Sequence, residues 1–419
     1  MSLNRREAAV RIAAAMAAPA LLARPAFAQG AAPIKVGVIT QLTGFAQIYG
    51  EANKVGTEIA ARRINAAGGI NGRPIELVLR DDKGSPEATI AAYRELAGEG
   101  IKFFIAGPIS GTVVALAPLL KGTDHVLLGA GPNNLAITHE LYNENVFRLQ
   151  LTSIPVFRGL GTVVAQKEPT AQRWVAISSD QQANIDLSNI FLGSLKGAHA
   201  GKGQNATILP IVLTKAGAGD FRNQISQLAN SGATGVLNSL VGSDSLTFYK
   251  QAKAFGLDQK VQVFADVGAN LASLSSIASS VPKAIWTPTY WHPQGDNNAV
   301  SQEVFKQAAE RTGSPYPYGF IALAHDALVA LAHAIRTAKG AETRPVIAAL
   351  EAEKPMGAAG PIVFRKADHT YTGDMCFIKV GGDASAKDGI KVADVVRIPS
   401  GEYMEPATPG QKYVIPQQQ

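Results

Sequence analysis

The sequence predicts an α/β protein with two lobes, each built on a parallel, doubly wound sheet. Apolar, β-rich runs alternate with segments of helical period along most of the 419 residues, a pattern typical of strands joined by crossover helices. Up to about residue 150 the pattern forms four such units, and a similar series begins again at Trp174. One sheet would not accommodate this many units, so we expect two lobes, with the chain crossing between them more than once.

The first unit, residues 34–86, is the most informative segment of the chain. It combines a buried strand, a polar glycine-containing loop, an amphipathic helix, a Gly-Gly and Asn-Gly turn, and a second strand that ends in Asp81 and Asp82. Such a βαβ opening places the loop 41–50 at the carboxyl end of the first strand. Ligands of open α/β sheets bind at that edge.

The remaining elements follow from the same periodicities. Strands are expected at 34–39, 75–79, 103–106, 126–128, 174–177, 207–211, 236–239 and 261–265. Helices are expected at 51–66, 86–97, 112–120, 156–165, 187–195, 220–229, 245–255, 299–311 and 318–339. Pro86 fits the first position of its helix, and Gly256 fits the left-handed residue that ends another. From Gly357 onward the glycine- and proline-rich sequence predicts short strands and a tail.

The amino terminus has the features of an export signal. Arg5 and Arg6 precede an apolar, alanine-rich stretch at 12–23, and a small-x-small cleavage site follows at 26–28. We therefore expect residues 1–28 to be removed. The paired arginines favour the twin-arginine route, and the general secretory route stays open.

Charge and cysteine content narrow the possible partners. The net charge is +6, and removal of the signal, with four arginines and one glutamate, leaves 35 basic and 32 acidic residues, or +3. The sequence has no basic cluster long enough to follow a phosphate backbone, which argues against a nucleic-acid partner. Outside the signal we expect no membrane-spanning segment. The single cysteine, Cys376, cannot form an intrachain disulfide.

One candidate anion site lies after the strand expected at 103–106. Residues 107–112 form a small-residue turn that opens a helix, where free backbone N–H groups and the positive end of the helix dipole converge. A hydroxyl from Ser110 or Thr112 would complete a cradle for a carboxylate. The same residues would also be explained as a helix cap without a ligand.

Other motifs favour binding over catalysis or metal chemistry. The loop 129–134 lacks the third glycine of a dinucleotide fingerprint, so Asn133 and Asn134 are better explained as hydrogen-bonding groups for a small ligand. His325 and His333 have no third ligand at a matching spacing, and we expect no metal and no cofactor. No orienting acid or nucleophile elbow accompanies the hydroxyls and histidines, so we expect no enzyme activity. The aromatic cluster at 286–291 fits a core and a ligand-stacking wall equally well.

Several segments together resemble the periplasmic substrate-binding proteins of branched-chain amino acid-type ABC importers. The resemblance covers residues 34–365 and is carried by the following segments: the opening 34–86, VFRLQ at 146–150, AGDFRNQISQLANSGATGVL at 218–237, FYKQAKAFGL at 248–257 and ALAHDALVALAHAI at 322–335. In the last segment His325 replaces the tyrosine that this family usually carries. Their order and spacing, more than any single motif, make the resemblance specific.

This resemblance implies two Rossmann-like lobes joined by a three-stranded hinge, the type I periplasmic binding protein fold. Lobe one would comprise residues 33–152 and 288–358, lobe two residues 153–287 and 359–410, and a tail would follow at 411–419. In family members that bind amino acids, lobe one holds the ligand carboxylate. The corresponding positions in this sequence are Tyr49, Ser110, Gly111, Thr112, Pro132, Asn133 and Asn134.

Lobe two departs from the family pattern. Asn184 stands near the place of a pocket tyrosine, and the loop around Gly242 replaces a glycine-rich loop. The acidic residue that would pair with an α-ammonium falls at Val267, with Asp266 one residue before it. An amino-acid ligand therefore requires Asp266 to turn toward the site. Otherwise an aromatic or aliphatic acid without an amine fits better.

The resemblance implies a periplasmic receptor that captures a small carboxylate-bearing solute between its lobes and delivers it to an ABC permease. We expect a monomer that does not insert into the membrane itself. A ligand-sensing regulatory module of the same fold is the alternative. Genes for a permease and an ATPase beside this one would favour transport.

Overall fold

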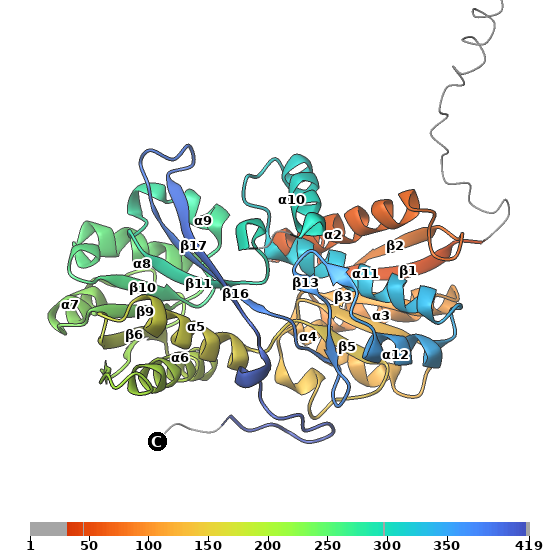
Figure 1. The fold of residues 1–419 in the computed structure, drawn as a ribbon, viewed down its shortest axis with the longest axis horizontal. Coiled ribbons are helices and arrows are strands. Elements are labelled where there is room, and N and C mark those ends of the chain that lie inside the picture. The colour runs from red at the N-terminus through yellow and green to blue at the C-terminus, as the bar shows by residue number, and fades with distance from the viewer. Residues whose placement is uncertain (1–31, 45, 296–297, 416–419) are drawn as a thin grey trace, which may run out of the picture.

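The computed structural model of the protein describes residues 32–44, 46–295 and 298–415. Two sheets of mostly parallel strands, each covered by helices, form two lobes that lie side by side (Figure 1). This architecture confirms the predicted fold class. The expected export signal at 1–28 and its twin-arginine motif lie outside the described residues, as does the end of the predicted tail.

The sheet of lobe one has the strand order β14-β15-β5-β4-β3-β1-β2. All its neighbouring strands are parallel except β14 and β15, which form an antiparallel pair. The strands are β1 (Ile34–Thr40), β2 (Ile75–Asp81), β3 (Phe103–Gly107), β4 (Val126–Ala130), β5 (Val146–Leu149), β14 (Phe364–Arg365) and β15 (Thr370–Tyr371). The helices are α2 (Gln47–Ala66), α3 (Pro86–Gly98), α4 (Ser110–Leu116), α10 (Ala299–Thr312), α11 (Gly319–Thr337) and α12 (Thr343–Ala352).

The sheet of lobe two has the order β17-β16-β11-β10-β9-β6-β7, and β8 also pairs with β6. Its parallel strands are β6 (Arg173–Ser179), β7 (Thr207–Ile208), β8 (Val212–Thr214), β9 (Gly235–Ser239), β10 (Val263–Asp266) and β11 (Ile285–Thr289), and the antiparallel β16 (Met375–Gly382) and β17 (Ile390–Ile398) complete it. The helices are α5 (Ser153–Lys167), α6 (Gln182–Ala200), α7 (Arg222–Asn230), α8 (Ser243–Ala254) and α9 (Leu271–Ser275). A small separate hairpin joins β12 (Met356–Gly357) to β13 (Gly360–Pro361).

The chain passes between the two sheets three times before its final strands end. It crosses between β5 and α5, between β11 and α10, and between β15 and β16. The last crossing differs from the expected boundary at residue 358, because β15 pairs with β5 through Thr370 and Arg148. Residues 364–371 therefore belong to the sheet of lobe one. Two-residue strands carry too little periodicity to be recognised in a sequence.

Local sequence explains where several elements begin and end. Pro86 is the first residue of α3, as predicted, and the Ser85 side chain caps that helix by accepting from the Ala88 N–H. Gly256 has φ of 70° and ends α8, as predicted. The strand expected at 207–211 is divided into β7 and β8. Pro210 lies between them and has no N–H for the ladder.

Helix α11 is the most buried helix of lobe one. It is 19 residues long and apolar enough to pass for a membrane span by length and composition alone. However, 72% of its most apolar window is buried inside the protein. Gly56 of α2 allows a close approach, since a Cβ there would lie 2.1 Å from the Ile321 carbonyl oxygen. These contacts identify α11 as a core helix.

Candidate ligand-binding site

A cavity of about 360 Å³ lies where the two lobes meet. Lobe one contributes Tyr49, Asn133 and residues 316–320, and lobe two contributes residues 267–271. Most of the remaining wall comes from the three connections between the lobes, at 150–153, 288–293 and 374–378. Both lobes and all three connections therefore contact the same space.

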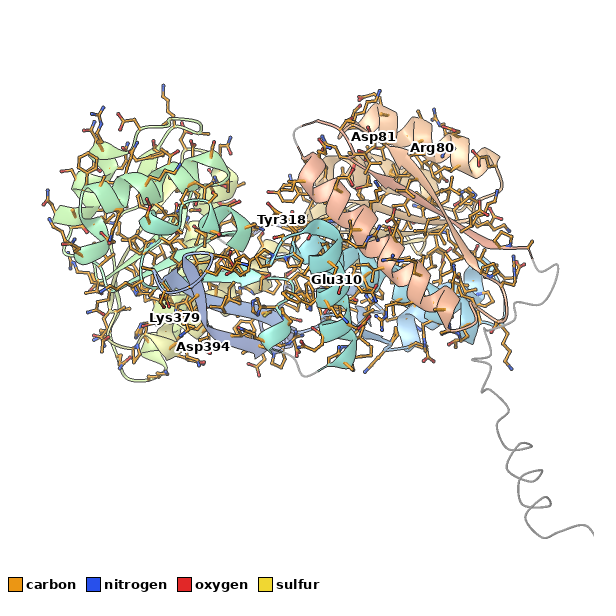
Figure 2. All side chains as sticks on the ribbon, turned by 90° about the horizontal axis from the view of Figure 1, so that it is seen from above. Arg80, Asp81, Glu310, Tyr318, Lys379 and Asp394 are labelled. Atoms are coloured by element: carbon orange, nitrogen blue, oxygen red, sulfur yellow. The ribbon has the colours of Figure 1, made fainter. Side chains whose placement is uncertain are left out.

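Aromatic side chains form much of the cavity wall. Tyr49 is 39% exposed, and its ring centroid lies 5.9 Å from that of Tyr318 and 5.2 Å from that of Phe320. Seen from above, Tyr318 lies between the two lobes (Figure 2). The other aromatic side chains that line the cavity are Phe157, Tyr290, Trp291, Phe305, Tyr316 and Phe377. Their flat faces suit a planar, apolar ligand.

The structure divides the aromatic cluster of residues 286–291 into two roles. Trp286 is fully buried in lobe two, and its indole N–H donates to Glu168 over 2.8 Å. Tyr290 and Trp291 line the cavity. The Trp291 indole N–H donates to the Ser301 hydroxyl over 2.7 Å, so that this ring is held in place from behind.

The polar groups of the cavity are mostly neutral. Among the described residues that line it, none is a lysine or arginine, and Asp374 is the one carboxylate. Burial lowers the pKa of His292 to about 4, so this imidazole is neutral at physiological pH. Its Nδ1 accepts from the Gln294 N–H, an assignment that leaves the proton on Nε2. His292 can therefore offer a neutral hydrogen-bond donor.

Two of the predicted lobe-one positions, Tyr49 and Asn133, line the cavity. Ser110 lies behind Asn133, since its hydroxyl accepts from the Asn133 N–H over 3.2 Å and lies 3.3 Å from Oδ1. Thr112 is 1% exposed, and its hydroxyl donates to the Ile109 carbonyl. The Thr112 hydroxyl is thus satisfied within its own helix.

Three further predicted positions of lobe one are outside the cavity lining. Gly111 is exposed, Pro132 is buried, and the Asn134 side chain caps the following turn by accepting from the Ala136 N–H. All three flank Ser110 or Asn133 in the chain. The structure therefore brings the two predicted loops together, with Ser110 and Asn133 hydrogen-bonded to each other.

On the side of lobe two, Val267 lines the cavity and Asp266 does not. The Asp266 carboxylate accepts from the Tyr249 hydroxyl at 2.8 Å and from the Gly268 N–H at 2.9 Å. Asn238 and Ser245 donate to it at 3.0 and 3.2 Å. Burial raises the pKa of Asp266, and these hydrogen bonds oppose the rise. Asp266 thus turns into lobe two, away from where an ammonium group would lie.

The other two predicted positions of lobe two also serve local structure. Asn184 is 7% exposed, and its side-chain amide donates to the Ser179 hydroxyl over 2.7 Å. Gly242 has φ of 59° and precedes α8. Neither residue is among those that line the cavity.

Several cavity residues were not foreseen from the sequence. They are contributed by the crossings between the lobes, and examples are Thr152, Thr289, His292, Asp374 and Met375. Asp374 precedes the long strand β16, in a region where we expected short strands. The sequence did contain one signal of polar structure near the first crossing, since Arg148 stands in the apolar strand β5, where it is fully buried.

No group of three or more His, Cys, Asp or Glu side chains suited to a metal occurs within the described ranges. His325 is instead buried, with Nδ1 2.8 Å from Asp326 and Nε2 2.9 Å from the Arg63 guanidinium. His333 lies 3.2 Å from Glu353. Both histidines have protein partners.

Comparison with known proteins identifies this architecture. The family described as "Periplasmic binding protein" matches residues 33–387. A Leu/Ile/Val-binding protein homologue of Brucella melitensis is 35% identical over 120 residues, 28% of this chain and 32% of that protein. The matched segment thus spans about a third of the length of that relative.

Solved structures match over nearly the whole length. The closed form of a leucine-, isoleucine-, valine-, threonine- and alanine-binding protein from Brucella ovis aligns with a TM-score of 0.77 at 18% identity, covering 90% of this chain and 97% of that chain. A Rhodopseudomonas palustris solute-binding protein in complex with 3,4-dihydroxybenzoic acid aligns with a TM-score of 0.72 at 17% identity, covering 88% and 98%. At 17–18% identity these alignments show a shared fold and nothing more.

These findings agree with the expectation that the chain is a binding protein rather than an enzyme. The family match covers residues of both lobes and all three crossings. The chain belongs to the periplasmic binding protein family and has its type I fold.

Proposed function

We propose that this protein is an extracytoplasmic solute receptor, which binds a small carboxylate-bearing solute between its lobes and delivers it to an ABC permease. The observation that carries this proposal is the cavity lined by both lobes and by all three connections. A ligand that contacts both lobes binds the closed form more tightly than the open form. Such differential affinity is what drives closure and allows a permease to distinguish loaded from empty receptor.

The cavity favours an aromatic acid without an amine over an amino acid. An α-ammonium buried beside Val267 would lack a carboxylate partner there, because Asp266 faces lobe two and the one carboxylate among the described cavity residues, Asp374, lies 3.8 Å from the Arg397 guanidinium. Losing such a charge-assisted bond costs about 1.5–3 kcal/mol. The aromatic wall offers stacking surface in its place. Related folds occur both in a protein named for binding leucine, isoleucine, valine, threonine and alanine and in one solved with 3,4-dihydroxybenzoic acid.

The polar end of the solute would meet neutral donors. Asn133, supported by Ser110, and His292 are within the wall or directly behind it. A carboxylate held by neutral donors keeps its charge when several hydrogen bonds replace water. Tyr49 would cover one face of the ligand's aromatic ring. Gly111, Thr112, Pro132, Asn134, Asn184 and Gly242 would then support these loops without reaching the solute.

A thermal-shift screen tests this proposal, with benzoate, 3,4-dihydroxybenzoate, leucine and a dicarboxylate as probes. A ligand at about 100 times its dissociation constant stabilises the protein by roughly 2.7 kcal/mol. We expect a shift with an aromatic acid and none with leucine. A shift with leucine alone would overturn the assignment to an amine-free acid.

The variant Val267→Asp places a carboxylate on the cavity wall and leaves residue 266 itself unchanged. We expect it to weaken binding of an aromatic acid by roughly tenfold or more, since like charges about 5 Å apart repel by about 3 kcal/mol at an effective dielectric constant near 20. Val267→Asn, of similar size and uncharged, is the control. Equal affinity of the Asp and Asn variants would contradict a carboxylate in this cavity.

The proposal also includes the partners and the compartment. The receptor would act in the periplasm as a monomer and dock on the membrane subunits of an ABC permease, without a nucleic-acid partner and without inserting into the membrane. Light scattering of purified protein tests the oligomeric state. Ligand-dependent stimulation of ATP hydrolysis by the transporter, reconstituted in vesicles, separates transport from a purely sensory role.

A further inference from the structure

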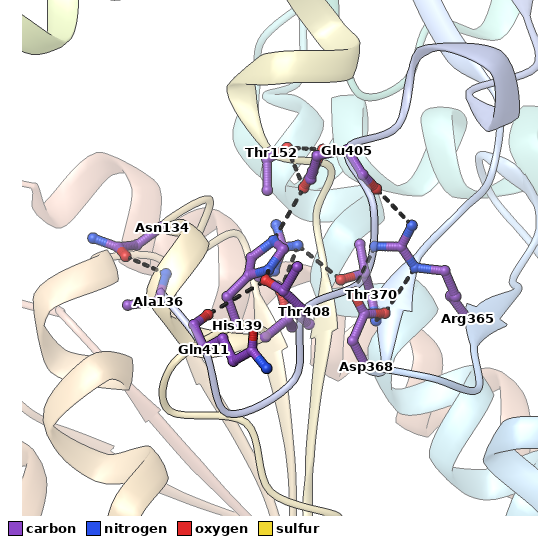
Figure 3. Close-up of polar contacts among 12 residues, drawn as sticks. Asn134, Ala136, His139, Thr152, Arg365, Asp368, Thr370, Glu405, Thr408 and Gln411 are labelled. Atoms are coloured by element: carbon purple, nitrogen blue, oxygen red, sulfur yellow. Dashed lines mark hydrogen bonds and ion pairs between the residues drawn. The ribbon is translucent and has the colours of Figure 1, made fainter. Parts of the chain in front are cut away.

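The chain does not end in lobe two after β17. Residues 400–413, here called the C-terminal strap, run back across the first crossing to lobe one (Figure 3). This path differs from the expected placement of residues up to 410 in lobe two. The strap is fastened at several points, and Tyr413 stacks on His139 with ring centroids 5.2 Å apart.

Glu405 is the central anchor of the strap. It is fully buried, and both of its carboxylate oxygens accept from the Thr152 hydroxyl, at 2.9 and 3.0 Å. His139 Nε2 lies 3.7 Å from Oε1, and the Arg365 guanidinium donates to the Glu405 backbone carbonyl over 2.8 Å. Burial alone would raise the pKa of Glu405, but His139, Arg148 and Thr152 together lower it.

The residues next to Glu405 fasten the strap to lobe one. His139 Nδ1 lies 2.6 Å from the Thr408 hydroxyl, and the Gly410 N–H donates to the His139 carbonyl over 2.7 Å. His139 therefore contacts the strap at Glu405, Thr408, Gly410 and Tyr413. A carboxylate as deeply buried as Glu405 persists only with such partners.

The same network lies directly behind the ligand cavity. Thr152 and Gln150 both line the cavity, and Thr152 immediately precedes α5. The fully buried Arg148 donates to the Gln150 carbonyl over 2.9 Å, and its positive charge favours the ionised form of Glu405. The first crossing is thus held from behind by a buried cation and a buried anion.

The strap is bonded to both lobes over a very short distance. The Arg158 guanidinium, from α5 of lobe two, donates to the Tyr403 carbonyl over 3.1 Å. Glu405, two residues later, is bonded to lobe one. Two residues span at most about 7 Å when fully extended. A rotation of the lobes must therefore turn about this point or break one of these bonds.

We propose that the C-terminal strap is a fourth connection between the lobes, and that Glu405 is a positioning residue that restrains their opening and holds Thr152 on the cavity wall. Because lobe motion is measured without ligand, this proposal does not depend on which solute binds. Loss of the anchor would leave three connections and free the Thr152 hydroxyl. Hinge motion and the position of Thr152 would then change together.

Interlobe distances in ligand-free protein test this proposal. Spin labels are attached at two exposed sites, Lys121→Cys in lobe one and Lys260→Cys in lobe two, and pulsed electron paramagnetic resonance then measures the lobe separation. The native cysteine, Cys376, is buried and therefore shielded from the label. In this background we compare Glu405→Gln, Thr152→Val and both together, with Glu402→Gln, at an exposed strap position, as control. We expect Glu405→Gln to raise the ratio of open to closed molecules by roughly tenfold, the scale of one charge-assisted hydrogen bond.

The double variant distinguishes positioning from general loosening. If Glu405 acts through Thr152, Glu405→Gln should change the distance distribution much less when residue 152 is already valine. We expect the Glu402→Gln distribution to match that of the unmodified strap. Unchanged distributions in both Glu405→Gln and a chain truncated after Pro399 would overturn the proposal. Equal effects of Glu405→Gln with and without the Thr152→Val substitution would overturn the route through Thr152.

Discussion

Replacing Asp266 with asparagine separates two roles that the sequence alone left open. If this carboxylate paired with a ligand ammonium, the change would weaken binding. In the structure Asp266 instead accepts hydrogen bonds within lobe two, from Tyr249, Asn238, Ser245 and the Gly268 N–H. We therefore expect Asp266→Asn to lower stability and to leave the affinity for an aromatic acid unchanged.

The size of the stability loss follows from these four donors. An asparagine has one carbonyl oxygen and one amide nitrogen, so at least one donor, either Gly268 N–H or one of the side-chain groups, faces another donor. A buried donor left without an acceptor costs about 1–3 kcal/mol. Asparagine is uncharged, so the substitution also removes the cost of burying a charged carboxylate, the same cost that raises the pKa of Asp266. The net expected loss at neutral pH is about 1–3 kcal/mol.

The raised pKa of Asp266 also predicts how the stability cost of Asp266→Asn changes with pH. Because the pKa of Asp266 is raised in the folded state, the folded protein holds this proton more tightly than the unfolded chain. The stability that this proton contributes is fully present below the unfolded pKa, about 3.9, and is lost as pH rises through the higher folded value. The cost of Asp266→Asn should therefore be larger at about pH 4 than at about pH 8.

Chemical denaturation of both proteins at the two pH values measures this difference, and calorimetry measures ligand affinity. Asp220→Asn is the matched control, since Asp220 is exposed in the same lobe, paired with Arg222; a change within about 0.5 kcal/mol is expected there. A cost that is larger at the higher pH would show that the folded protein stabilises the Asp266 carboxylate. A tenfold loss of affinity would show that Asp266 contacts the ligand after all.

Two further predictions concern the cavity itself. Ser110→Ala should weaken binding of a carboxylate probe by roughly tenfold, because Asn133 loses the support of the Ser110 hydroxyl. Thr112→Val should weaken binding less, because the Thr112 hydroxyl already donates to the Ile109 carbonyl. Equal losses of affinity for the two variants in calorimetry would contradict this. Because His292 has a pKa of about 4, benzoate affinity should stay level as pH falls from about 8 to about 5.5. A rise in affinity on acidification, centred near pH 6.5 and absent in His292→Gln, would contradict the neutral imidazole, because an imidazolium would attract the carboxylate.

The regular elements could be predicted because their periodicity is local. The helix expected at 299–311 is found as α10 (Ala299–Thr312), and the helix expected at 318–339 as α11 (Gly319–Thr337). Where short-range sequence was ambiguous, the prediction failed. The glycine-rich end forms two strands of eight and nine residues, β16 and β17. β16 pairs with β11, far away in sequence, and β17 pairs with β16, and these contacts stabilise both strands more than their own propensity indicates.

The orientation of Asp266 illustrates what periodicity leaves undecided. Neighbouring residues of a strand point to opposite sides, so Asp266 and Val267 at the end of β10 could not both face the cavity. Which of them does so depends on Tyr249 and Asn238, which lie on α8 and β9. Polar partners from other elements, here 17 and 28 residues away, decided the outcome.

The C-terminal strap was missed for the same reason, but the sequence did carry a sign of it. Arg148 lies in the apolar strand β5, where every residue is buried, and a guanidinium persists in such a place only with anionic or polar partners. A rule that demands partners for a charge in a buried strand would have predicted acidic or polar partners nearby, one of which is Glu405. The sequence could not show that Glu405 is this partner, because Glu405 bonds to Thr152 across a separation of 253 residues. A charged residue that interrupts an apolar strand therefore indicates where distant segments of a chain must meet.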